Sequence, residues 1–371
     1  MKILFLTESL DRQSGWGRYS SSLIKTLKSS DIEVSILCQE RHDDTGFLYQ
    51  VSGLPEVLNF RSNYVFFLLY VAKLLLCRNL EKPDIIHCVV ETYAPIAWIL
   101  SKYWGIPYVV TVHGSFGIKT LINPWCRWIQ KRCYRQAQAV IAVSNYTKKR
   151  LLEKVLLTNV VVIPNGVDES FFSIRSTNTG APIVLGVGAL KHRKGFHTVL
   201  RAIKEVKKSI PNIKYYMVGS GKDVKYCTSL KTIIDDLGLG DTVVEYNSVD
   251  EGELRSLYGE SRLFVLTPIS DEYDFEGFGL VYLEANAAGL PVIGTSNSGA
   301  EDAVSDGVSG FLVLPENVSA LVEKMLLVLQ DSSVYNKLSQ CGRAWAKSMT
   351  WDVAIKQYKK VYDFKRHSVH N

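Results

Sequence analysis

The sequence contains no apolar run of the roughly 18 residues that a membrane-spanning helix needs. Its longest apolar stretch, residues 64–77, is interrupted by Lys73. The opening MKILFLTES has too few apolar residues for a signal peptide and is typical of a first buried strand. We therefore expect no spanning helix and no secretory leader, and a cytoplasmic location.

Cysteine is not scarce, but the seven cysteines form no CxxC and no paired spacing. This favours free thiols in a reducing compartment over a disulfide framework or a metal site. The acidic DEYD, residues 271–274, lacks the spacing of a metal-binding DxD, so we expect a solvated or sugar-facing loop there. A metal-dependent site is not predicted.

Nucleic-acid motifs are also absent, and SGWGRY, residues 14–19, lacks the GxGxxG spacing of a dinucleotide fold. The charge is unevenly spread. Residues 1–175 hold 21 basic and 14 acidic side chains, a net charge of +7, whereas the remainder holds 22 and 23, a net charge of −1. The basic half indicates an anionic partner, and a membrane surface or a phosphorylated acceptor fits at least as well as nucleic acid.

The pattern that is present is an alternation of short apolar runs with helical segments, which begins at residue 2 and restarts near residue 182. Strands that are apolar throughout predict parallel sheets covered by helices on both faces. We expect two Rossmann-like, doubly wound α/β domains, residues 1–172 and 173–351, with a last helix at about 352–371 that packs back on the first. Ligands bind at the carboxyl ends of such strands, here in a cleft between the domains.

The segment DFEGFGLVYLE, residues 274–284, follows a strand and opens a helix. Gly277 and Gly279 fall at the helix N-terminus, where free N–H groups and the helix dipole bind anions. Glu276 and Glu284 can accept hydroxyls of a sugar and a ribose. Taken alone, a glycine loop with an incidental glutamate remains an alternative.

Other candidate residues also follow strands. Arg193 and Lys194, in KHRKG, could neutralise a diphosphate, although a solvated charge run has the same pattern. Gly15 and Gly17 suit close approach to a phosphate. His113 closes the strand YVVTV, where a packed histidine is the common alternative to one that faces a ligand.

Together these segments resemble one family. FEGFGL with Glu284 matches the E-x7-E signature of retaining glycosyltransferases of family 4, which have the GT-B fold and belong to glycosyl transferases group 1. IPNGVD (163–168), VSNYTKKRL (143–151), GALKHRKG (188–195), MVGSGKD (217–223) and residues 290–313 resemble family segments in the family's order. The resemblance covers nearly the whole chain, and its combination of motifs is specific.

The resemblance implies a nucleotide-sugar donor held largely by the second domain. Glu284 would bond the ribose, Glu276 the donor sugar, and Lys194 with Arg193 the diphosphate. The remaining donor-binding positions would be Gly15, Gly17, Gly219, Gly277, Phe278, Gly279 and Leu280. His113 would bond the sugar near its reacting face and, with Glu276, would act in catalysis. The family retains the anomeric configuration and needs no metal or other cofactor.

The sequence departs from the family at two positions. Ala189 stands where the family often has a phosphate-binding arginine, so Arg193 or Lys191 would have to replace it. Asn247 replaces a glycine in a loop that often touches the base. The nucleotide therefore stays open between a UDP-sugar and a GDP-sugar.

Two segments of the first domain bear on the acceptor. Residues 63–82 are aromatic and flanked by cations, and residues 119–136 interleave Trp125, Trp128 and Tyr134 with cations. Such helices can lie in a membrane interface, or they can simply pack in a core with solvated cations. A glycan or lipid-linked acceptor at the inner face of the cell membrane is the partner that these segments favour.

We thus expect a hexosyltransferase of envelope polysaccharide, lipopolysaccharide or glycolipid assembly. A GT-B sugar-nucleotide epimerase and a non-catalytic nucleotide-sugar-binding subunit are the alternatives, the second suggested by Ala189. A nucleotide-binding oxidoreductase would rest on SGWGRY alone and would leave the second domain unexplained.

Overall fold

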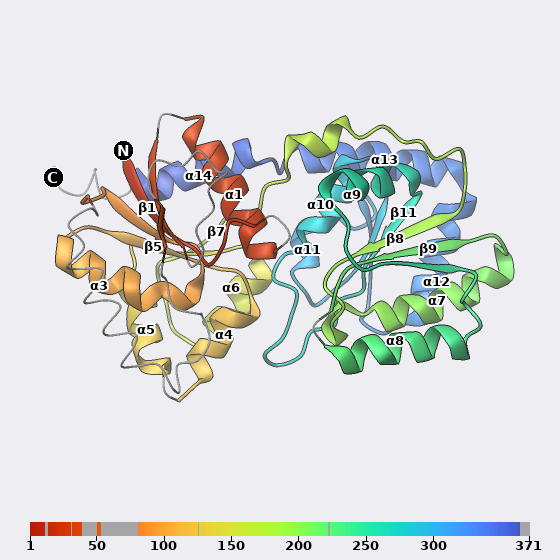
Figure 1. Ribbon diagram of the computed structural model, residues 1–371, viewed down its shortest axis with the longest axis horizontal. Coiled ribbons are helices and arrows are strands. Elements are labelled where there is room, and N and C mark those ends of the chain that lie inside the picture. Colours follow the sequence, from red (N-terminus) through yellow and green to blue (C-terminus); the bar gives the residue numbers. More distant parts are fainter. Residues whose placement is uncertain are drawn as a thin grey trace. The chain divides into compact units, whose positions relative to one another are not determined.

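The computed structural model describes residues 1–11, 14–30, 32–38, 50–52, 81–124, 126–221 and 223–363. Contacts divide the chain into two compact units. One holds Met1–Asn165 and the segment that starts at Trp351, and the other holds Gly166–Thr350. This division falls a few residues before the predicted boundary between residues 172 and 173. Each unit is an α/β sandwich (Figure 1).

The first unit is built on a seven-stranded, fully parallel sheet in the order β3-β2-β1-β4-β5-β6-β7. Phe5 pairs with Ile36 on one side and with His87 on the other. Strands β1, β4, β5 and β6 are buried almost throughout, as a sheet covered on both faces requires. The strands are β1 (Lys2–Leu6), β2 (Glu33–Cys38), β3 (Gln50–Ser52), β4 (Ile85–Cys88), β5 (Tyr108–Val112), β6 (Ala139–Ala142) and β7 (Val160–Val162).

Local signals set the helix ends in this unit. The Ser14 side chain accepts a hydrogen bond from the Gly17 amide and caps α1, while Gly105, at φ +63°, ends α3. The helical elements are α1 (Gly15–Lys28), η2 (Glu91–Tyr93), α3 (Ala94–Trp104), α4 (Ser115–Ile122), α5 (Arg127–Gln136) and α6 (Asn145–Leu152).

The basic segment 119–136 is divided between two helices, α4 and α5. The helix α4 ends at Ile122, and Asn123 is extended. The cause is Pro124, because a proline pushes the residue before it out of the helical region. Tyr134 is buried, so this aromatic residue packs inward, whereas Trp128 is 70% exposed. Trp125 and most of segment 63–82 lie outside the described residues.

The helix α14 (Trp351–Asp363) completes the core of the first unit, far along the chain from the strands that it covers. Trp351, Tyr358 and Tyr362 join one buried cluster with Phe5 and Leu23. Figure 1 shows α14 alongside α1. None of the helices in the described ranges is both long and apolar enough to span a membrane.

The fully buried His87 imidazole connects α14 to the sheet. Its Nδ1 atom lies 2.8 Å from the Tyr362 hydroxyl, and its Nε2 atom lies 2.8 Å from the Thr111 hydroxyl. Burial lowers the pKa of His87 to about 3, with a further contribution from His113, so the ring is neutral at physiological pH. Each ring nitrogen therefore has a hydroxyl partner inside the core.

We expect Tyr362→Phe to lower the free energy of unfolding by about 1–3 kcal/mol, because it leaves a buried nitrogen of His87 without a partner. Urea unfolding followed by tryptophan fluorescence measures the change. Tyr103→Phe removes the same hydroxyl from a ring that is largely exposed and should leave stability unaltered. Equal stability of Tyr362→Phe and wild type would contradict the assigned role of this hydrogen bond.

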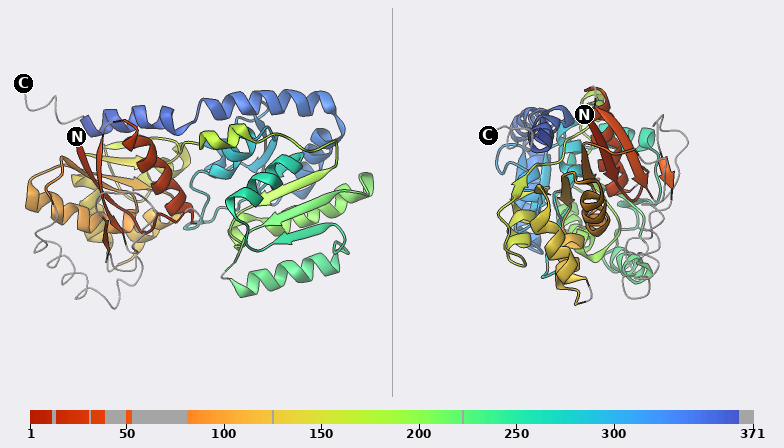
Figure 2. Two further views of the ribbon diagram at one scale, coloured as in Figure 1. Left: turned by 45° about the horizontal axis from the view of Figure 1, so that its top comes forward. Right: turned by 90° about the vertical axis from the view of Figure 1, so that its left-hand side faces the viewer.

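The second unit has a six-stranded parallel sheet in the order β10-β9-β8-β11-β12-β13. Helices cover both faces: α7, α8 and α12 gather on one side, and α9, α10 and α13 on the other (Figures 1 and 2). The strands are β8 (Ile183–Val187), β9 (Lys214–Val218), β10 (Val243–Tyr246), β11 (Leu263–Val265), β12 (Val292–Thr295) and β13 (Gly310–Val313).

The helices of the second unit follow its strands in turn, as the sequence pattern predicts. They are η3 (Glu169–Ser173), η4 (His192–Lys194), α7 (Phe196–Ser209), α8 (Val224–Asp236), α9 (Glu251–Glu260), α10 (Leu280–Ala287), α11 (Ala300–Ala303), α12 (Val318–Gln330) and α13 (Ser332–Lys347). Every strand is parallel, so the loops that leave β8, β9 and β11 emerge at one edge of the sheet. The predicted donor residues of this unit lie in these loops or on α10.

Candidate active site

The loop after β8 carries the two candidate cations, and a glycine fixes its shape. Gly195 has φ +71°, and a Cβ atom there would lie 1.8 Å from the Thr267 carbonyl oxygen. The Thr267 hydroxyl donates to the Gly195 carbonyl at 2.9 Å, and the Ile269 amide donates to the Arg193 carbonyl at 2.8 Å. The cationic loop is therefore fastened by its backbone to the segment that follows β11.

The loop after β11 brings Glu276 to the same place. The Gly299 amide donates to the Glu276 carbonyl at 2.8 Å, and a Cβ atom on Gly299 would lie 2.2 Å from the Gly277 carbonyl oxygen. Gly279, at φ +85°, begins α10 without a side-chain cap. A Cβ atom there would lie 2.6 Å from the Tyr282 ring, whose hydroxyl donates to the Leu266 carbonyl at 2.7 Å.

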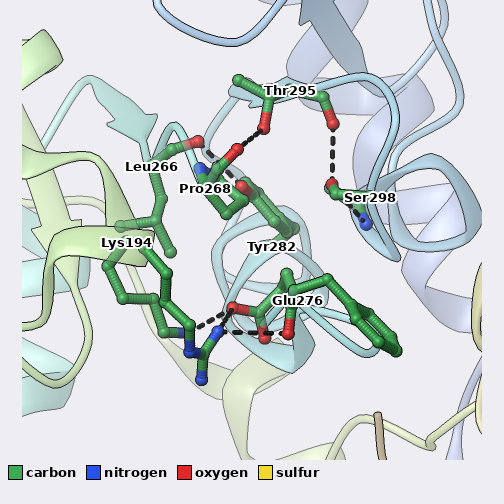
Figure 3. Close-up of polar contacts among 10 residues, drawn as sticks. Lys194, Leu266, Pro268, Glu276, Tyr282, Thr295 and Ser298 are labelled. Carbon is green, nitrogen blue, oxygen red and sulfur yellow. Dashed lines mark hydrogen bonds and ion pairs between the residues drawn. The ribbon is translucent and has the colours of Figure 1, made fainter. Parts of the chain in front are cut away.

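The three charged side chains meet on one oxygen atom (Figure 3). Glu276 Oε2 lies 2.5 Å from Lys194 Nζ and 3.0 Å from Arg193 Nη1. Arg193 Nη1 also donates to the Phe275 carbonyl at 3.4 Å. Glu276 is 9% exposed, so two cations share one nearly buried carboxylate at the start of α10.

The electrostatics of this cluster keep Glu276 ionised. Burial alone would raise the pKa of Glu276, but the charges and hydrogen bonds of Lys194 and Arg193 outweigh it and lower the pKa to about 2. Burial also lowers the pKa of Lys194, an effect that the charge of Glu276 opposes. The two loops are thus held together by an ion cluster. Another anion can compete with Glu276 for the two cations.

Glu276 should make stability pH-dependent in acid. Its folded pKa, about 2, lies below its ordinary value of 4.5, so its contribution is present above pH 4.5 and is lost as the pH falls toward 2. We expect this loss to reach roughly 3 kcal/mol, at about 1.4 kcal/mol for each pKa unit.

Urea unfolding of wild type and Glu276→Gln between pH 5 and pH 2 checks this expectation. The difference between the two proteins should shrink as the pH falls, because the wild-type carboxylate becomes neutral as well. A difference that stays constant across this range would show that the ion cluster does not stabilise the fold.

Glu284 lies on α10 beneath the surface. It is 2% exposed, and its Oε2 atom accepts the Tyr258 hydroxyl at 3.2 Å. Phe278 is buried too, which leaves its backbone as the part able to face a ligand, and Leu280 is the first residue of the helix. The predicted N-terminal amides therefore do lie at a helix start.

The loop after β9 packs directly against the loop after β8. A Cβ atom on Gly219 would lie 1.9 Å from the Gly188 carbonyl oxygen, and the Gly188 amide donates to the Val218 carbonyl at 2.9 Å. Ala189, beside Gly188, is exposed, and so is Lys191. Of the two proposed substitutes for the missing arginine, Arg193 is the one that the structure places on Glu276.

The acidic loop 271–274 is closed by its own side chain. The Asp271 carboxylate accepts the amides of Tyr273 at 2.7 Å and Asp274 at 2.6 Å, as in an Asx turn. Within the described part of the chain, no group of three or more His, Cys, Asp or Glu residues could hold a metal ion.

In the first unit, the local structure explains why residue 17 is a glycine. A Cβ atom there would lie 2.0 Å from the Asp11 carbonyl oxygen, and the Gly17 amide already donates to Ser14 Oγ at 2.9 Å. Gly15 is exposed, with open space where a Cβ atom would stand. Of the two predicted phosphate-facing glycines, Gly15 is the one whose surroundings admit a ligand.

His113 lies at the carboxyl end of β5, as predicted, with its ring partly buried. Its Nε2 atom donates to the Val89 carbonyl at 2.8 Å, and its ring meets the edge of Tyr19 at a centroid distance of 4.4 Å. Burial lowers the pKa of His113 to about 4, against the opposing effect of the Val89 hydrogen bond. The ring is therefore neutral at physiological pH, with its proton on Nε2.

The structure thus brings Arg193, Lys194 and Glu276 into contact and sets Gly277, Gly279 and Glu284 beside them on one unit. Gly15, Gly17 and His113 belong to the other unit. Sequence reasoning missed the residues that hold the loops in place: Gly195, Thr267, Tyr282 and Gly299. Gly195 directly follows the cations in KHRKG, and a glycine at that position could have indicated a tight turn in the loop.

Sequence models of two families match the chain. The one described as Glycosyl transferases group 1 matches residues 167–345, and the one described as Glycosyltransferase Family 4 matches residues 13–171. An uncharacterized glycosyltransferase of Methanocaldococcus jannaschii is 26% identical over 371 residues, which cover 98% of each chain. A GDP-mannose-dependent alpha-(1-6)-phosphatidylinositol monomannoside mannosyltransferase of Mycolicibacterium smegmatis is 29% identical and covers 68% of this chain and 69% of its own.

Solved structures agree on the fold. A sucrose-phosphate synthase of Thermosynechococcus elongatus superimposes with a TM-score of 0.81 at 19% identity, over 99% of this chain and 100% of its own. Anabaena HepE, solved with UDP and glucose, gives 0.80 at 20% identity, over 97% of this chain and 98% of its own.

Two parallel-sheet units and a cationic donor-type loop beside an E-x7-E helix define a glycosyltransferase with the GT-B fold. The chain belongs to glycosyltransferase family 4, and its second half to glycosyl transferases group 1. The expected fold, family and enzyme class are confirmed.

Proposed function

We propose that this enzyme transfers a hexosyl group, with retention, from a nucleotide-diphosphate sugar to a hydroxyl of a glycan or lipid-linked acceptor in cell-envelope synthesis. The observation that carries the proposal is the convergence of Lys194 and Arg193 on Glu276 at the start of α10. Two cations beside the backbone amides at the N-terminus of α10 suit a diphosphate, and Glu276 accepts hydroxyls of the sugar attached to it.

The cluster also suits the chemistry. In transfer, the bond between the anomeric carbon and the phosphate oxygen breaks, and a bond from the same carbon to the acceptor oxygen forms on the same face. The acceptor proton passes to the leaving phosphate. Negative charge grows on the diphosphate, where Lys194, Arg193 and the amides of Gly277 to Leu280 are already in position to stabilise it. These cations supply the charge that a divalent metal supplies elsewhere, so we propose a metal-independent reaction.

The remaining roles follow the resemblance. Glu284 holds the ribose, the Gly219 backbone lines the nucleotide site, and Gly15 admits the diphosphate from the first unit. His113, neutral at physiological pH, bonds a hydroxyl of the donor sugar near its reacting face. By name, one relative uses GDP-mannose, and a solved neighbour contains UDP-glucose, so both nucleotides belong in the test.

Donor binding tests the site. Thermal shifts with UDP-, GDP- and ADP-sugars should identify one stabilising donor, which at 100 times its dissociation constant adds about 2.7 kcal/mol. Lys194→Ala and Arg193→Ala should each weaken that donor about 10- to 100-fold, because each removes a charge-assisted hydrogen bond. Lys191→Ala is the matched control, and its affinity should stay within about threefold of wild type.

Activity separates the alternatives. Two results would support metal-independent transfer. In EDTA, the enzyme should slowly release the nucleotide together with a sugar of retained anomeric configuration, and Glu276→Ala should lose this activity. Conversion of the donor sugar without release of the nucleotide would favour the epimerase, and binding without release or transfer would favour a non-catalytic subunit. A donor whose affinity falls in Lys191→Ala and not in Arg193→Ala would overturn the assignment of Arg193.

We also propose that the first unit docks on an anionic membrane through the outer face of α5. Trp128 is exposed, and the Arg132 guanidinium carbon lies 5.6 Å from the Trp98 ring centroid and 5.7 Å from that of Trp128. These residues adjoin a groove of about 220 Å³ that is lined by Trp128, Lys131, Arg132, Arg135 and Gln136. An aromatic ring among cations suits the boundary between headgroups and acyl chains.

Flotation with vesicles checks this docking. We expect binding to vesicles that contain phosphatidylglycerol and little binding to pure phosphatidylcholine, and a loss of binding as salt is raised. Arg132→Glu with Arg135→Glu should abolish flotation without altering donor affinity. A Lys207→Glu and Lys208→Glu pair on the second unit makes the same charge change as a control. Equal flotation of both pairs would contradict docking through α5.

A further inference from the structure

Glu91 is a carboxylate sealed inside the first unit, and the proposed reaction does not use it. It is fully buried and begins η2, just beyond β4. A charged side chain is rarely left in such a place without a partner or a purpose. The contacts of Glu91 indicate what that purpose is.

The segment that carries Glu91 holds His113 at two points. Glu91 Oε1 accepts the His113 backbone amide at 3.4 Å. Two residues earlier, the Val89 carbonyl accepts His113 Nε2 at 2.8 Å. One short segment therefore fixes both the backbone and the ring of His113.

The carboxylate also lies against the start of α4. Gly114, the N-cap residue, has no side chain that could cap the first turn. The position of a Cβ atom on Gly117 is 3.4 Å from Glu91 Oε1 and 2.4 Å from a Val112 methyl carbon. A glycine at this position avoids a clash with the Val112 methyl group and leaves the turn in contact with the carboxylate. The positive end of the helix favours a negative charge there.

The second carboxylate oxygen has no such partner. Within the described part of the chain, Glu91 Oε2 is buried without a hydrogen bond, and so is the neighbouring Thr92 hydroxyl. Burial raises the pKa of Glu91 to about 7, against the backbone amides of Glu91, His113 and Gly117, which favour the ionised form. The pKa of this buried carboxylate therefore lies within the physiological pH range.

We propose that Glu91 is a positioning residue for His113: its ionised carboxylate anchors the turn from β5 into α4, and protonation releases that turn. This rests on the proposed role of His113 at the donor sugar. Glu91 touches no substrate and acts through the His113 amide and the first turn of α4. Transfer then requires the ionised form, and the turn loosens as the pH falls below neutrality.

Among the residues that the structure describes, the groups around Glu91 do not offer its carboxylate another counter-charge. The ionisable side chains that sense its charge are Cys88 at the end of β4, Tyr134 on α5 and Tyr19 on α1, all neutral at physiological pH. His113, on the turn itself, is neutral as well. The buried residues of α3 are apolar apart from Ser101. The ionised carboxylate is therefore stabilised by backbone amides, through the hydrogen bonds that it accepts from them.

The test is an amide titration of the whole protein, labelled with ¹⁵N. From pH 5.5 to pH 8.5 the His113 and Gly117 backbone amides should shift together with a midpoint near 7, since both donate to the ionised form. Glu91→Gln keeps the shape and removes the ionisation, so this shared transition should vanish. Thr92→Val, on the same turn, is the matched control and should titrate as wild type does. If Glu91→Gln does not fold, the wild-type and Thr92→Val titrations still decide the matter.

Kinetics form the second arm. In Glu91→Gln, kcat should fall about tenfold at pH 8 with little change in donor affinity, and the acid limb of the wild-type pH profile should disappear. Amides that do not titrate, or that titrate unchanged in Glu91→Gln, overturn the proposal. A shared titration in a protein that releases no nucleotide supports the positioning and counts against the proposed function instead.

Discussion

The Glu276 carboxylate of the second unit stays ionised because two cations from another loop, Lys194 and Arg193, bind it. Glu276 is nearly buried, and burial raises its pKa, but Lys194 and Arg193 lie within hydrogen-bonding distance and lower the pKa below its ordinary value. Close contacts of the local backbone hold the two loops in the positions that this ion cluster requires. Gly195 lets the cationic loop touch Thr267, and Gly299 lets the next loop close over Gly277. Removal of both cations would leave the buried carboxylate without a partner, which costs more than the ion pairs contribute.

The first unit also holds buried ionisable side chains, and their partners are hydroxyls and backbone amides in place of cations. His87 is neutral and fully buried, and its two nitrogens are satisfied by Tyr362 on α14 and Thr111 on β5. Tyr19 hydrogen-bonds the Tyr358 hydroxyl and packs edge-on against His113. The last helix therefore contributes to the surroundings of a residue that we place in the reaction. Glu91 supports that residue from the other side, through its backbone.

Much of the fold could be predicted from periodicity. Apolar runs such as KILFLT and YVVTV are strands because both faces of a parallel sheet are covered, and Gly289 and Pro291 end the helix that Glu284 sits on. The residues of the donor-type cluster could also be named, because cations and glycines follow strands in a fixed order. The break before Pro124 is itself a sequence signal, because a proline disfavours the helical conformation of the residue before it. The inward position of Tyr134 could not be predicted, since about half a turn of rotation around the helix axis separates an exposed ring from a buried one.

By itself the sequence determined the parallel α/β architecture and the residue types of the site, because strand periodicity and helix starts are local properties of the chain. Only the tertiary structure decided which charges meet. Arg193 and Lys191 are both cations of KHRKG, yet Arg193 contacts Glu276 and Lys191 is exposed, since the Gly195 turn and its bonds to Thr267 set the direction of each side chain. Tertiary structure likewise placed Glu91 under His113. Their 22-residue separation carries no signal until two strands end side by side at the same edge of a sheet.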